Sequence, residues 1–300
     1  MLKVAFHSNY VYPLPDNHRF PMEKYDLLPK QLVHEGTLTE SNFFEPTSIP
    51  DELVLSTHDS DYYKKLCSLN LSPREERVTG FMHSQLLIER EKTIMEGTRL
   101  GAELALSSGA ALNIAGGTHH AFTNRGEGFC LLNDQAIAAN WLIQEGKAKN
   151  ILIIDLDVHQ GNGTAEIVKD NPSIFTFSMH GKNNYPLHKE KSDLDVELED
   201  ATSDKEFLYQ LSKSIDEVMN SFLPDFIFYQ CGVDVLASDK LGRLGLTLQG
   251  CKERDKRVFD LVRQLDVPVV CTMGGGYSHD IKTIIEAHAN TFREIQYSLF

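Results

Sequence analysis

The 300-residue chain has 29 Lys and Arg residues against 43 Asp and Glu residues, a formal net charge of −14 at pH 7. That length is too great for a peptide or a disulfide-stapled miniprotein, and 41% hydrophobic and 9% aromatic residues supply a full core, which argues against intrinsic disorder. The acidic balance argues against a general nucleic-acid binder, which needs a basic face.

Apolar runs that suit buried strands alternate with longer helical patterns from end to end. Each run is apolar on both faces, as the central strands of a parallel sheet are. The expected strands are Leu2–Phe6, Ala111–Ala115, Ile151–Leu156, Ile174–Ser178, Phe226–Gln230 and Val267–Thr272. Apolar residues at three- and four-residue spacing predict helices over Ile94–Ser107, Asp134–Gln144, Asp204–Phe222, Leu248–Leu265 and Asp280–Glu294. The third helix follows Ser203, with a Ser-x-x-Glu capping box that ends at Glu206.

This alternation predicts a three-layer α/β fold around a central, mostly parallel sheet. No Pro/Ser-rich linker, internal repeat or low-complexity tract divides the chain, so residues 1–300 are expected to form a single domain. The segment Asn42–Phe81 fits neither pattern, and we interpret it as a surface excursion that shapes the mouth of a site.

Polar or glycine-rich segments follow nearly every expected strand. The sequence passes from NIA to GGTHH, from ILII to DLDVHQGNG, from FTFS to MHGKNNY, from FIFYQ to CGVD and from VVCT to MGGGY. In open α/β sheets, ligands bind at the carboxyl ends of the strands. These segments therefore predict a functional site where the strand ends converge.

The segment Asp155–His159 has the alternation of a metal site. In extended backbone every second side chain shares a face, so Asp155, Asp157 and His159 point together. Two carboxylates and an imidazole at a strand end suit a divalent cation better than ordinary polar capping.

A catalytic zinc keeps three protein ligands and an open position for water. Asp157 and His159 supply two of them, and Asp234 at another strand end is the best third ligand. Such a set could bind Zn²⁺, Fe²⁺ or Co²⁺, and spacing alone does not choose.

Two further strand ends have groups suited to acid–base and electrostatic catalysis. His119 and His120 follow Gly-Gly-Thr, and adjacent loop histidines are candidates for metal ligands or for an acid–base pair beside a metal. Tyr277 follows three glycines, and its phenol could donate a hydrogen bond to a developing oxyanion. The alternative for Tyr277 is a packing role after a glycine turn at a helix N-terminus.

The segments GGTHHA, GEGFCLLND, DLDVHQGNGT, YQCGVDVLASDKLGRLGLT and GGGY, in this order, resemble the zinc-dependent histone deacetylases of the arginase–deacetylase superfamily. The resemblance runs from about Lys3 to the C-terminus. DVHQGNG, Tyr185-Pro186 and ASDKLGRLGL resemble the class IV branch (histone deacetylase 11-like) more than class I or II, and the compact length suits a bacterial class IV-like enzyme. The resemblance implies a single arginase/deacetylase-like α/β domain whose long loops form the pocket.

The resemblance also implies a role for each matching residue. Asp157, His159 and Asp234 would bind Zn²⁺, with Fe²⁺ or Co²⁺ possible. His120 would be the general base and acid, His119 its electrostatic neighbour oriented by Asp155, and Tyr277 would polarise the amide carbonyl. The acyl-lysine tunnel would be formed by Gly128, Phe129, Tyr185 and Leu241. A structural K⁺ would be held by Asp155, Ser178 and the backbone carbonyls of Asp157, His159 and Met179.

One position departs from the class I pattern. In class I enzymes an aspartate backs the second histidine, and here that position is Asn162, as in class IV. An asparagine can orient an imidazole but cannot stabilise imidazolium by charge, which puts the rate on simple acetyl substrates in question but not the metal. The alternative is that Asn162 merely caps the Gly161–Gly163 turn, far from His120.

The resemblance implies hydrolysis of the amide of N-ε-acyl-lysine in a protein or peptide, and the class IV likeness favours long-chain fatty acyl groups. An acetylpolyamine or other small-molecule amidohydrolase is the closest alternative, and the net charge of −14 mildly favours such an acylated amine substrate. A binuclear manganese ureohydrolase would need further metal-binding aspartates. An inactive binding scaffold should have lost a ligand, the His pair or the Tyr, all of which this chain retains.

The cysteines and the N-terminus indicate the compartment. Five cysteines without a CxxC pair argue against a disulfide framework or a thiolate zinc site and favour a reducing compartment. The N-terminal MLKVAFHSNYVYP resembles neither a signal peptide nor an anchor, and no stretch approaches the roughly 20 apolar residues of a membrane span. We expect a cytoplasmic enzyme with no direct nucleic-acid contact and no membrane span, of open oligomeric state.

Overall fold

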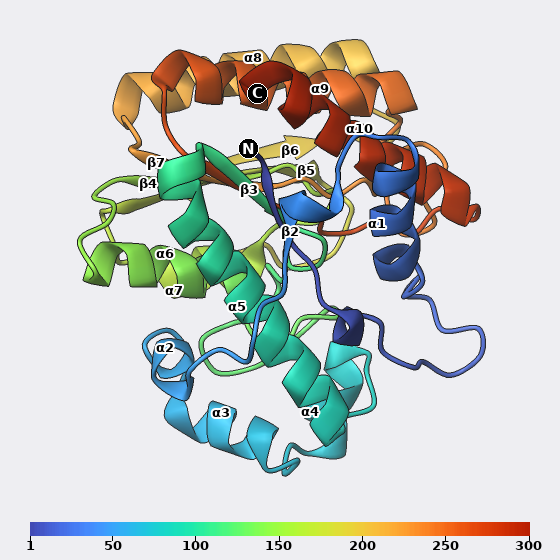
Figure 1. The fold of residues 1–300 in the computed structure, drawn as a ribbon, viewed down its shortest axis with the longest axis vertical. Helices are drawn as coiled ribbons and strands as arrows, with labels where there is room; N and C mark the ends of the chain where they lie inside the picture. Colours follow the sequence, from blue (N-terminus) through green and yellow to red (C-terminus); the bar gives the residue numbers. More distant parts are fainter.

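A computed structural model describes residues 1–300 and has an eight-stranded sheet at its centre (Figure 1). The strand order is β2-β1-β3-β8-β7-β4-β5-β6, and every neighbouring pair is parallel. The strands are β1 Lys3–Ala5, β2 Phe43–Phe44, β3 Ala110–Asn113, β4 Ile151–Asp155, β5 Ile174–Gly181, β6 Leu194–Leu198, β7 Phe226–Gln230 and β8 Val269–Thr272. The expected three-layer α/β fold is confirmed, with a sheet that is parallel throughout.

Helices cover both faces of this sheet (Figure 1). On one face α5 packs against α6 and contacts β1, β3 and β8, and on the other α9 packs between α8 and α10, which contacts α1. The helices are α1 Lys24–His34, α2 Asp51–Leu55, α3 Ser60–Cys67, α4 Pro73–Thr79, α5 Gln85–Ser108, α6 Asp134–Gln144, α7 Asn162–Val168, α8 Asp204–Ser221, α9 Leu248–Leu265 and α10 Ile281–Leu299. No helix is long and apolar enough to cross a lipid bilayer. All five cysteines are free thiols.

The strands are apolar on both faces because each face meets its own helical layer. In β4, Ile151 and Ile153 pack in a cluster with Trp141 of α6. Leu152 and Ile154, which point the other way, belong to the larger cluster that includes residues of α9 and α10. Burying one such side chain fully contributes about 1.5–3 kcal/mol, so the alternation stabilises the central strands from both sides.

The strands and helices that the sequence did not predict are short, lie at the edges of the sheet or contain a proline. β2 has two residues, and β6 is an edge strand whose residues are mostly half-exposed, so neither forms an apolar run. Helix α1 contains Pro29, which interrupts a helical pattern. Helices α2, α3, α4 and α7 have between five and eight residues, too few for a clear period.

The interpretation of Asn42–Phe81 as a surface excursion is wrong for its beginning. Phe43 and Phe44 form the edge strand β2, which pairs with β1. The remainder contains α2, α3 and α4, and the carbonyl oxygen of Thr79 at the end of α4 accepts a hydrogen bond from the Phe129 amide (2.8 Å). Only this last part of the segment borders the site described below.

Half of the expected capping box at α8 forms. The Ser203 hydroxyl oxygen accepts a hydrogen bond from the Glu206 amide, but the Glu206 carboxylate accepts one from Gln210 (2.7 Å) one turn further on. The cap therefore satisfies one N-terminal amide of the helix.

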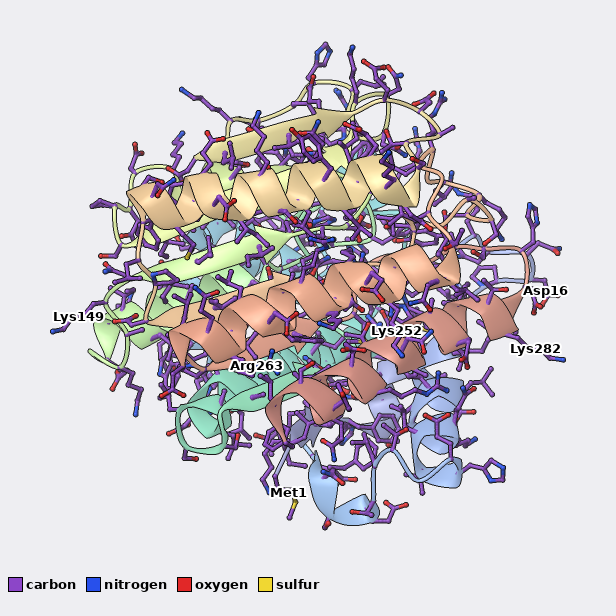
Figure 2. The ribbon with its side chains drawn as sticks, turned by 90° about the horizontal axis from the view of Figure 1, so that it is seen from above. Met1, Asp16, Lys149, Lys252, Arg263 and Lys282 are labelled. Carbon is purple, nitrogen blue, oxygen red and sulfur yellow. The ribbon has the colours of Figure 1, made fainter.

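Because all strands run in the same direction, their carboxyl ends lie along one edge of the sheet. Figure 2 shows Lys149, just before β4, at the opposite side of the molecule from Lys282, in the first turn of α10 after β8. The helices thus return the chain to the amino edge, and the polar segments that follow the strands gather at the carboxyl edge.

Candidate active site

Asp157, His159 and Asp234 form a buried cluster beyond the carboxyl ends of β4 and β7. His159 Nδ1 lies 3.1 Å from Asp157 Oδ1 and 3.1 Å from Asp234 Oδ2. The exposed fractions of the three residues are 1%, 8% and 0%. One ligand atom from each lies within 4.8 Å of the others. Residues 75 positions apart in the chain are thus brought together because β4 and β7 are neighbours in the sheet.

Backbone groups orient the two carboxylates. The Val158 amide donates to Asp234 Oδ1 (3.0 Å) and the Gly275 amide to Asp157 Oδ2 (2.8 Å). A Cβ on Gly232 would overlap Asp157 Oδ2, and one on Gly275 would overlap Asp234 Oδ2, so only glycine allows this close approach. Asp234 Oδ2 is buried and accepts no hydrogen bond of good geometry, and the polar atom 3.1 Å from it is Nδ1 of His159, the neighbouring member of the cluster.

The two adjacent histidines have different partners. His119 Nδ1 lies 2.7 Å from Asp155 Oδ2, and His120 Nδ1 lies 2.7 Å from Asn162 Oδ1. The two rings are 4.1 Å apart between centroids. Asn162 is the first residue of α7, and the arrangement in which it caps a turn far from His120 does not occur.

These partners separate the pKa values of the two imidazoles. Burial by itself lowers the pKa of His119, but the carboxylates of Asp155 and Asp157 outweigh it and raise this pKa to about 9. Burial lowers the pKa of His120 well below 6.5, and the neighbouring His119 and His159 lower it further. Near neutral pH, His119 is therefore cationic and His120 neutral, as a pair with divided roles requires.

Asp134, at the start of α6, holds the loop that contains the histidines. Its carboxylate accepts hydrogen bonds from the amides of Gly117 (3.0 Å) and Thr118 (2.9 Å) and from the hydroxyl of Thr98 (2.7 Å). Sequence reasoning did not assign Asp134 a role. Its only signal was its place in GEGFCLLND, directly before a helical pattern.

Tyr277 lies beside the cluster with its ring among other aromatic side chains. The centroid of its ring is 6.0 Å from that of Phe129 and 6.1 Å from that of Phe20. The Tyr277 amide donates to Asp239 Oδ2 (2.6 Å), a second carboxylate that sequence reasoning missed, in the ASDKLG segment. Burial raises the pKa of Tyr277 well above 10, so its hydroxyl stays protonated.

A cavity of about 390 Å³ opens from this cluster to the surface. Its lining includes the four residues expected to flank an acyl-lysine tunnel, namely Gly128, Phe129, Tyr185 and Leu241, together with His120, His159 and Tyr277. The Tyr185 ring meets the His120 ring edge-on at 4.9 Å between centroids. The structure therefore places the expected tunnel residues around the expected base.

The wall at Gly128 and Phe129 is a tight turn. The amide of Glu127 donates to the carbonyl oxygen of Cys130 (3.0 Å), and the amide of Cys130 donates back to Glu127 (2.8 Å). Gly128 and Phe129 both have positive φ, +52° and +67°, which is unusual for a phenylalanine. The Tyr185 hydroxyl donates to Glu127 Oε2 (2.5 Å), so the two walls of the cavity are joined.

Two buried cations support the site, and neither was identified from the sequence. Arg254 of α9 donates from Nη1 to the carbonyl oxygens of Leu156 (3.2 Å) and Gly232 (2.5 Å), which precede Asp157 and Asp234. Lys24 Nζ donates to the carbonyl oxygen of Gly274 (2.8 Å). A single basic residue in an amphipathic helix gives no sequence signal for such a role.

The residues expected around a monovalent cation meet where β4 and β5 end. Asp155 pairs with Ser178 in the β4–β5 register, and Met179 follows Ser178 in β5. Asp155 Oδ1 accepts a hydrogen bond from the Asp157 amide (3.1 Å). Asp155 Oδ2 meets His119 Nδ1 (2.7 Å) and the Ser178 hydroxyl meets His180 Nδ1 (2.9 Å), so both side chains also have partners within the protein.

Comparisons with known proteins agree with this geometry. The model of the histone deacetylase domain family matches residues 18–292. An uncharacterized protein of Picosynechococcus sp. is 42% identical over 95% of this chain and 95% of its own length. Histone deacetylase 2 of Arabidopsis thaliana is 30% identical over 89% of this chain and 72% of its own. The crystal structure of a histone deacetylase homologue from Aquifex aeolicus, 26% identical, superposes with a TM-score of 0.85 over 99% of this chain and 84% of that one.

Proposed function

The chain belongs to the histone deacetylase domain family, and on this premise we propose that it hydrolyses the amide of N-ε-acyl-lysine with the help of a divalent metal. The single observation that carries the proposal is the buried Asp157–His159–Asp234 cluster beside a neutral His120, at the base of an open cavity. Asp157, His159 and Asp234 would hold Zn²⁺, with Fe²⁺ or Co²⁺ as alternatives.

The donor set fits a divalent cation. Two carboxylates and one imidazole converge in a region with almost no exposed surface. Buried carboxylates without a cation are costly, and no hydrogen bond of good geometry satisfies Asp234 Oδ2. Three ligands also leave a coordination position open, which is the pattern of catalytic zinc. A bound divalent ion would supply Lewis acidity toward the amide carbonyl and lower the pKa of a water molecule.

His120 is the proposed general base. Its Nδ1–H donates to Asn162 Oδ1, so the lone pair is on Nε2. Its lowered pKa keeps it neutral and ready to accept a proton from water, which it can later give to the leaving lysine amine. His119, held by Asp155, would remain charged and stabilise negative charge that develops beside it.

Tyr277 is the proposed oxyanion donor. Its raised pKa keeps the phenol protonated, so it can donate a hydrogen bond to the carbonyl oxygen as negative charge develops there. Gly128, Phe129, Tyr185 and Leu241 would surround the lysine stem and the acyl group. The apolar surfaces of the Phe129 and Tyr185 rings suit methylene groups.

Three finer assignments remain part of the proposal. The likeness to class IV supports acyl chains longer than acetyl as substrates. A structural K⁺ would be held by Asp155, Ser178 and the carbonyl oxygens of Asp157, His159 and Met179, and the register that pairs Asp155 with Ser178 supports this. Five free cysteines are in keeping with a cytoplasmic location.

The test is a panel of lysine peptides bearing acetyl through myristoyl groups, assayed for hydrolysis beside acetylspermidine. Hydrolysis of at least one acyl-lysine peptide, lost when a chelator removes the metal and regained with added Zn²⁺, supports the proposal. Hydrolysis of acetylspermidine alone would favour a small-molecule amidohydrolase. No hydrolysis of any acyl amine by metal-loaded protein would refute both.

A further inference from the structure

The mouth of the cavity above the candidate active site has a positive charge that opposes the charge of the molecule as a whole. The chain has a formal net charge of −14. The cavity of about 390 Å³ is nevertheless lined by Arg19, Arg77 and Arg243 and by no Asp or Glu side chain. All three arginines are exposed, whereas Asp157, His159 and Asp234 are buried.

The three arginines come from separate parts of the chain. Arg19 precedes α1, Arg77 lies in the last turn of α4, and Arg243 lies in the loop between β7 and α9. The guanidinium carbon of Arg19 lies 6.0 Å from the centroid of the Phe129 ring, above one wall of the cavity. One helix end and two loops thus place cations around the same opening.

Arg19 and Arg77 are not neutralised by the protein. No ion pair or side-chain hydrogen bond within the protein involves either guanidinium, and only Arg243 has a partner, Asp200, at 3.3 Å. Both members of that pair are exposed, so their interaction is weak. Two guanidinium groups therefore face solvent at the mouth without a counter-charge.

Glu127 and Asp239, whose partners include the cavity-lining Tyr185, Leu241 and Tyr277, are held within the protein. Glu127 accepts hydrogen bonds from the Tyr185 hydroxyl and from Arg125 Nε (2.7 Å). Asp239 accepts hydrogen bonds from the amides of Leu241 (2.8 Å) and Gly242 (2.9 Å) as well as from that of Tyr277. Neither carboxylate pairs with Arg19 or Arg77, so the opening stays electropositive.

We propose that Arg19 and Arg77 form a recognition site for acidic residues next to the acylated lysine of a peptide or protein substrate. This inference rests on the proposed function and names its substrate class. The planar guanidinium fork matches a carboxylate with two parallel hydrogen bonds. When the acyl-lysine side chain enters the cavity, the residues that flank it in the peptide stay at the mouth, beside these arginines. A polycationic acylated polyamine meets repulsion at the same place.

The experiment compares one acyl-lysine peptide in three contexts, with Asp, Ala or Lys on both sides of the lysine, at low ionic strength. We expect kcat/KM to fall in the order Asp, Ala, Lys. We also expect the ratio between the Asp and Ala peptides to shrink as salt is added, because exposed charges are screened. The difference should lie in KM, since the arginines contact the flanking residues and not the reacting amide.

Two variants test whether the preference for the Asp peptide depends on the arginines at the cavity mouth. The double variant Arg19→Gln/Arg77→Gln should lower the ratio of kcat/KM for the Asp peptide to kcat/KM for the Ala peptide. Each substitution should contribute roughly a 2- to 5-fold decrease, the range of an exposed ion pair. Arg77→Glu should shift the preference toward the Lys peptide. Arg263→Gln is the matched control, because Arg263 lies near the end of α9 beside Gly109, at the amino edge of the sheet, and should leave the ratio unchanged.

The outcomes separate this inference from the proposed function. Hydrolysis of all three peptides without an Asp preference, or an equal loss of preference in Arg263→Gln, overturns the inference and leaves the proposed function standing. A clear preference for the Lys peptide or for acetylspermidine also overturns it. No hydrolysis of any peptide overturns the proposed function and the inference together.

Discussion

The Oδ1 atom of Asn162 lies 2.7 Å from Nδ1 of His120. Because an amide oxygen can only accept, this contact fixes the proton of the neutral imidazole on Nδ1 and leaves the lone pair on Nε2, the atom proposed to act as the base. Asn162 supplies orientation without charge. The neighbouring His119 has the carboxylate of Asp155 at the same distance, so two adjacent histidines have opposite electrostatic settings.

An Asn162→Asp variant should move the acid limb of the kcat/KM profile to higher pH. The acid limb reports the pKa of the essential base in the free enzyme, which we propose to be His120. In the wild type, burial lowers the pKa of His120. A carboxylate at hydrogen-bond distance favours imidazolium and raises this pKa, so activity falls at a higher pH. Asn171→Asp, which adds the same charge just beyond α7, is the control. An unmoved limb in a folded, metal-loaded variant would remove Asn162 from the catalytic site.

Asp157→Ala should abolish both hydrolysis and metal retention, because it removes one of three proposed ligands. Metal per chain is measured by elemental analysis after dialysis, with Asp260→Ala on α9 as a surface control. Full metal content in the Asp157→Ala protein would show that the ion, if any, binds elsewhere.

Tyr277→Phe should lower kcat by roughly 10²- to 10³-fold, the effect of losing one oxyanion donor. KM should change little, since the ring keeps its contacts with Phe129 and Phe20. Steady-state kinetics on the best peptide of the acyl series measure both constants. A kcat near that of the wild type would return Tyr277 to a packing role.

Longer acyl chains should be hydrolysed with higher kcat/KM than acetyl. Each methylene that leaves water for an apolar tunnel contributes about 0.8 kcal/mol, so a few methylenes are enough to separate the substrates. The series from acetyl to myristoyl on one peptide measures the trend. A steady decline from acetyl to octanoyl would instead indicate a short tunnel and contradict the class IV likeness.

His58 should make the fold sensitive to acid. Its Nδ1 donates to the carbonyl oxygen of Phe122 (3.0 Å), its Nε2 accepts from the Asn133 amide (2.9 Å), and burial lowers its pKa from 6.5 to about 4. The folded protein therefore excludes a proton that the unfolded chain binds below pH 6.5. The contribution of neutral His58 to the free energy of unfolding is therefore fully present above pH 6.5. It decreases as the pH falls toward 4, by roughly 3 kcal/mol in total.

Urea unfolding between pH 7 and pH 4.5 tests this dependence. A His58→Asn variant should be less stable at pH 7 but should lose less of its unfolding free energy on acidification than the wild type. His279→Asn, at an exposed position, should keep the wild-type slope. Parallel curves for the wild type and His58→Asn would contradict the assignment.

The sequence alone was enough to predict the α/β class, the six inner strands, the five long helices and the strand ends where the polar residues gather. This information is local. A strand buried on both faces must be apolar at consecutive positions, as Ile151–Ile154 are, and a parallel sheet must place its loops at one edge. The metal-site hypothesis for Asp157 and His159 likewise depended on residues two positions apart.

Tertiary structure set the contacts that determine the protonation of His120 and those on which the proposed selectivity depends. His120 and Asn162 are 42 residues apart, and Arg19 and Arg77 reach one opening from separate segments. The periodicity of apolar residues predicts which residues are buried, but it does not predict which loops become neighbours in space. That neighbourhood follows from the order β3-β8-β7-β4-β5 in the sheet, where strands distant in sequence become adjacent. A chain with a net charge of −14 can therefore have a positively charged cavity mouth. The net charge counts every residue equally, whereas the electrostatic interaction with a substrate is strongest for the charges that lie nearest to it.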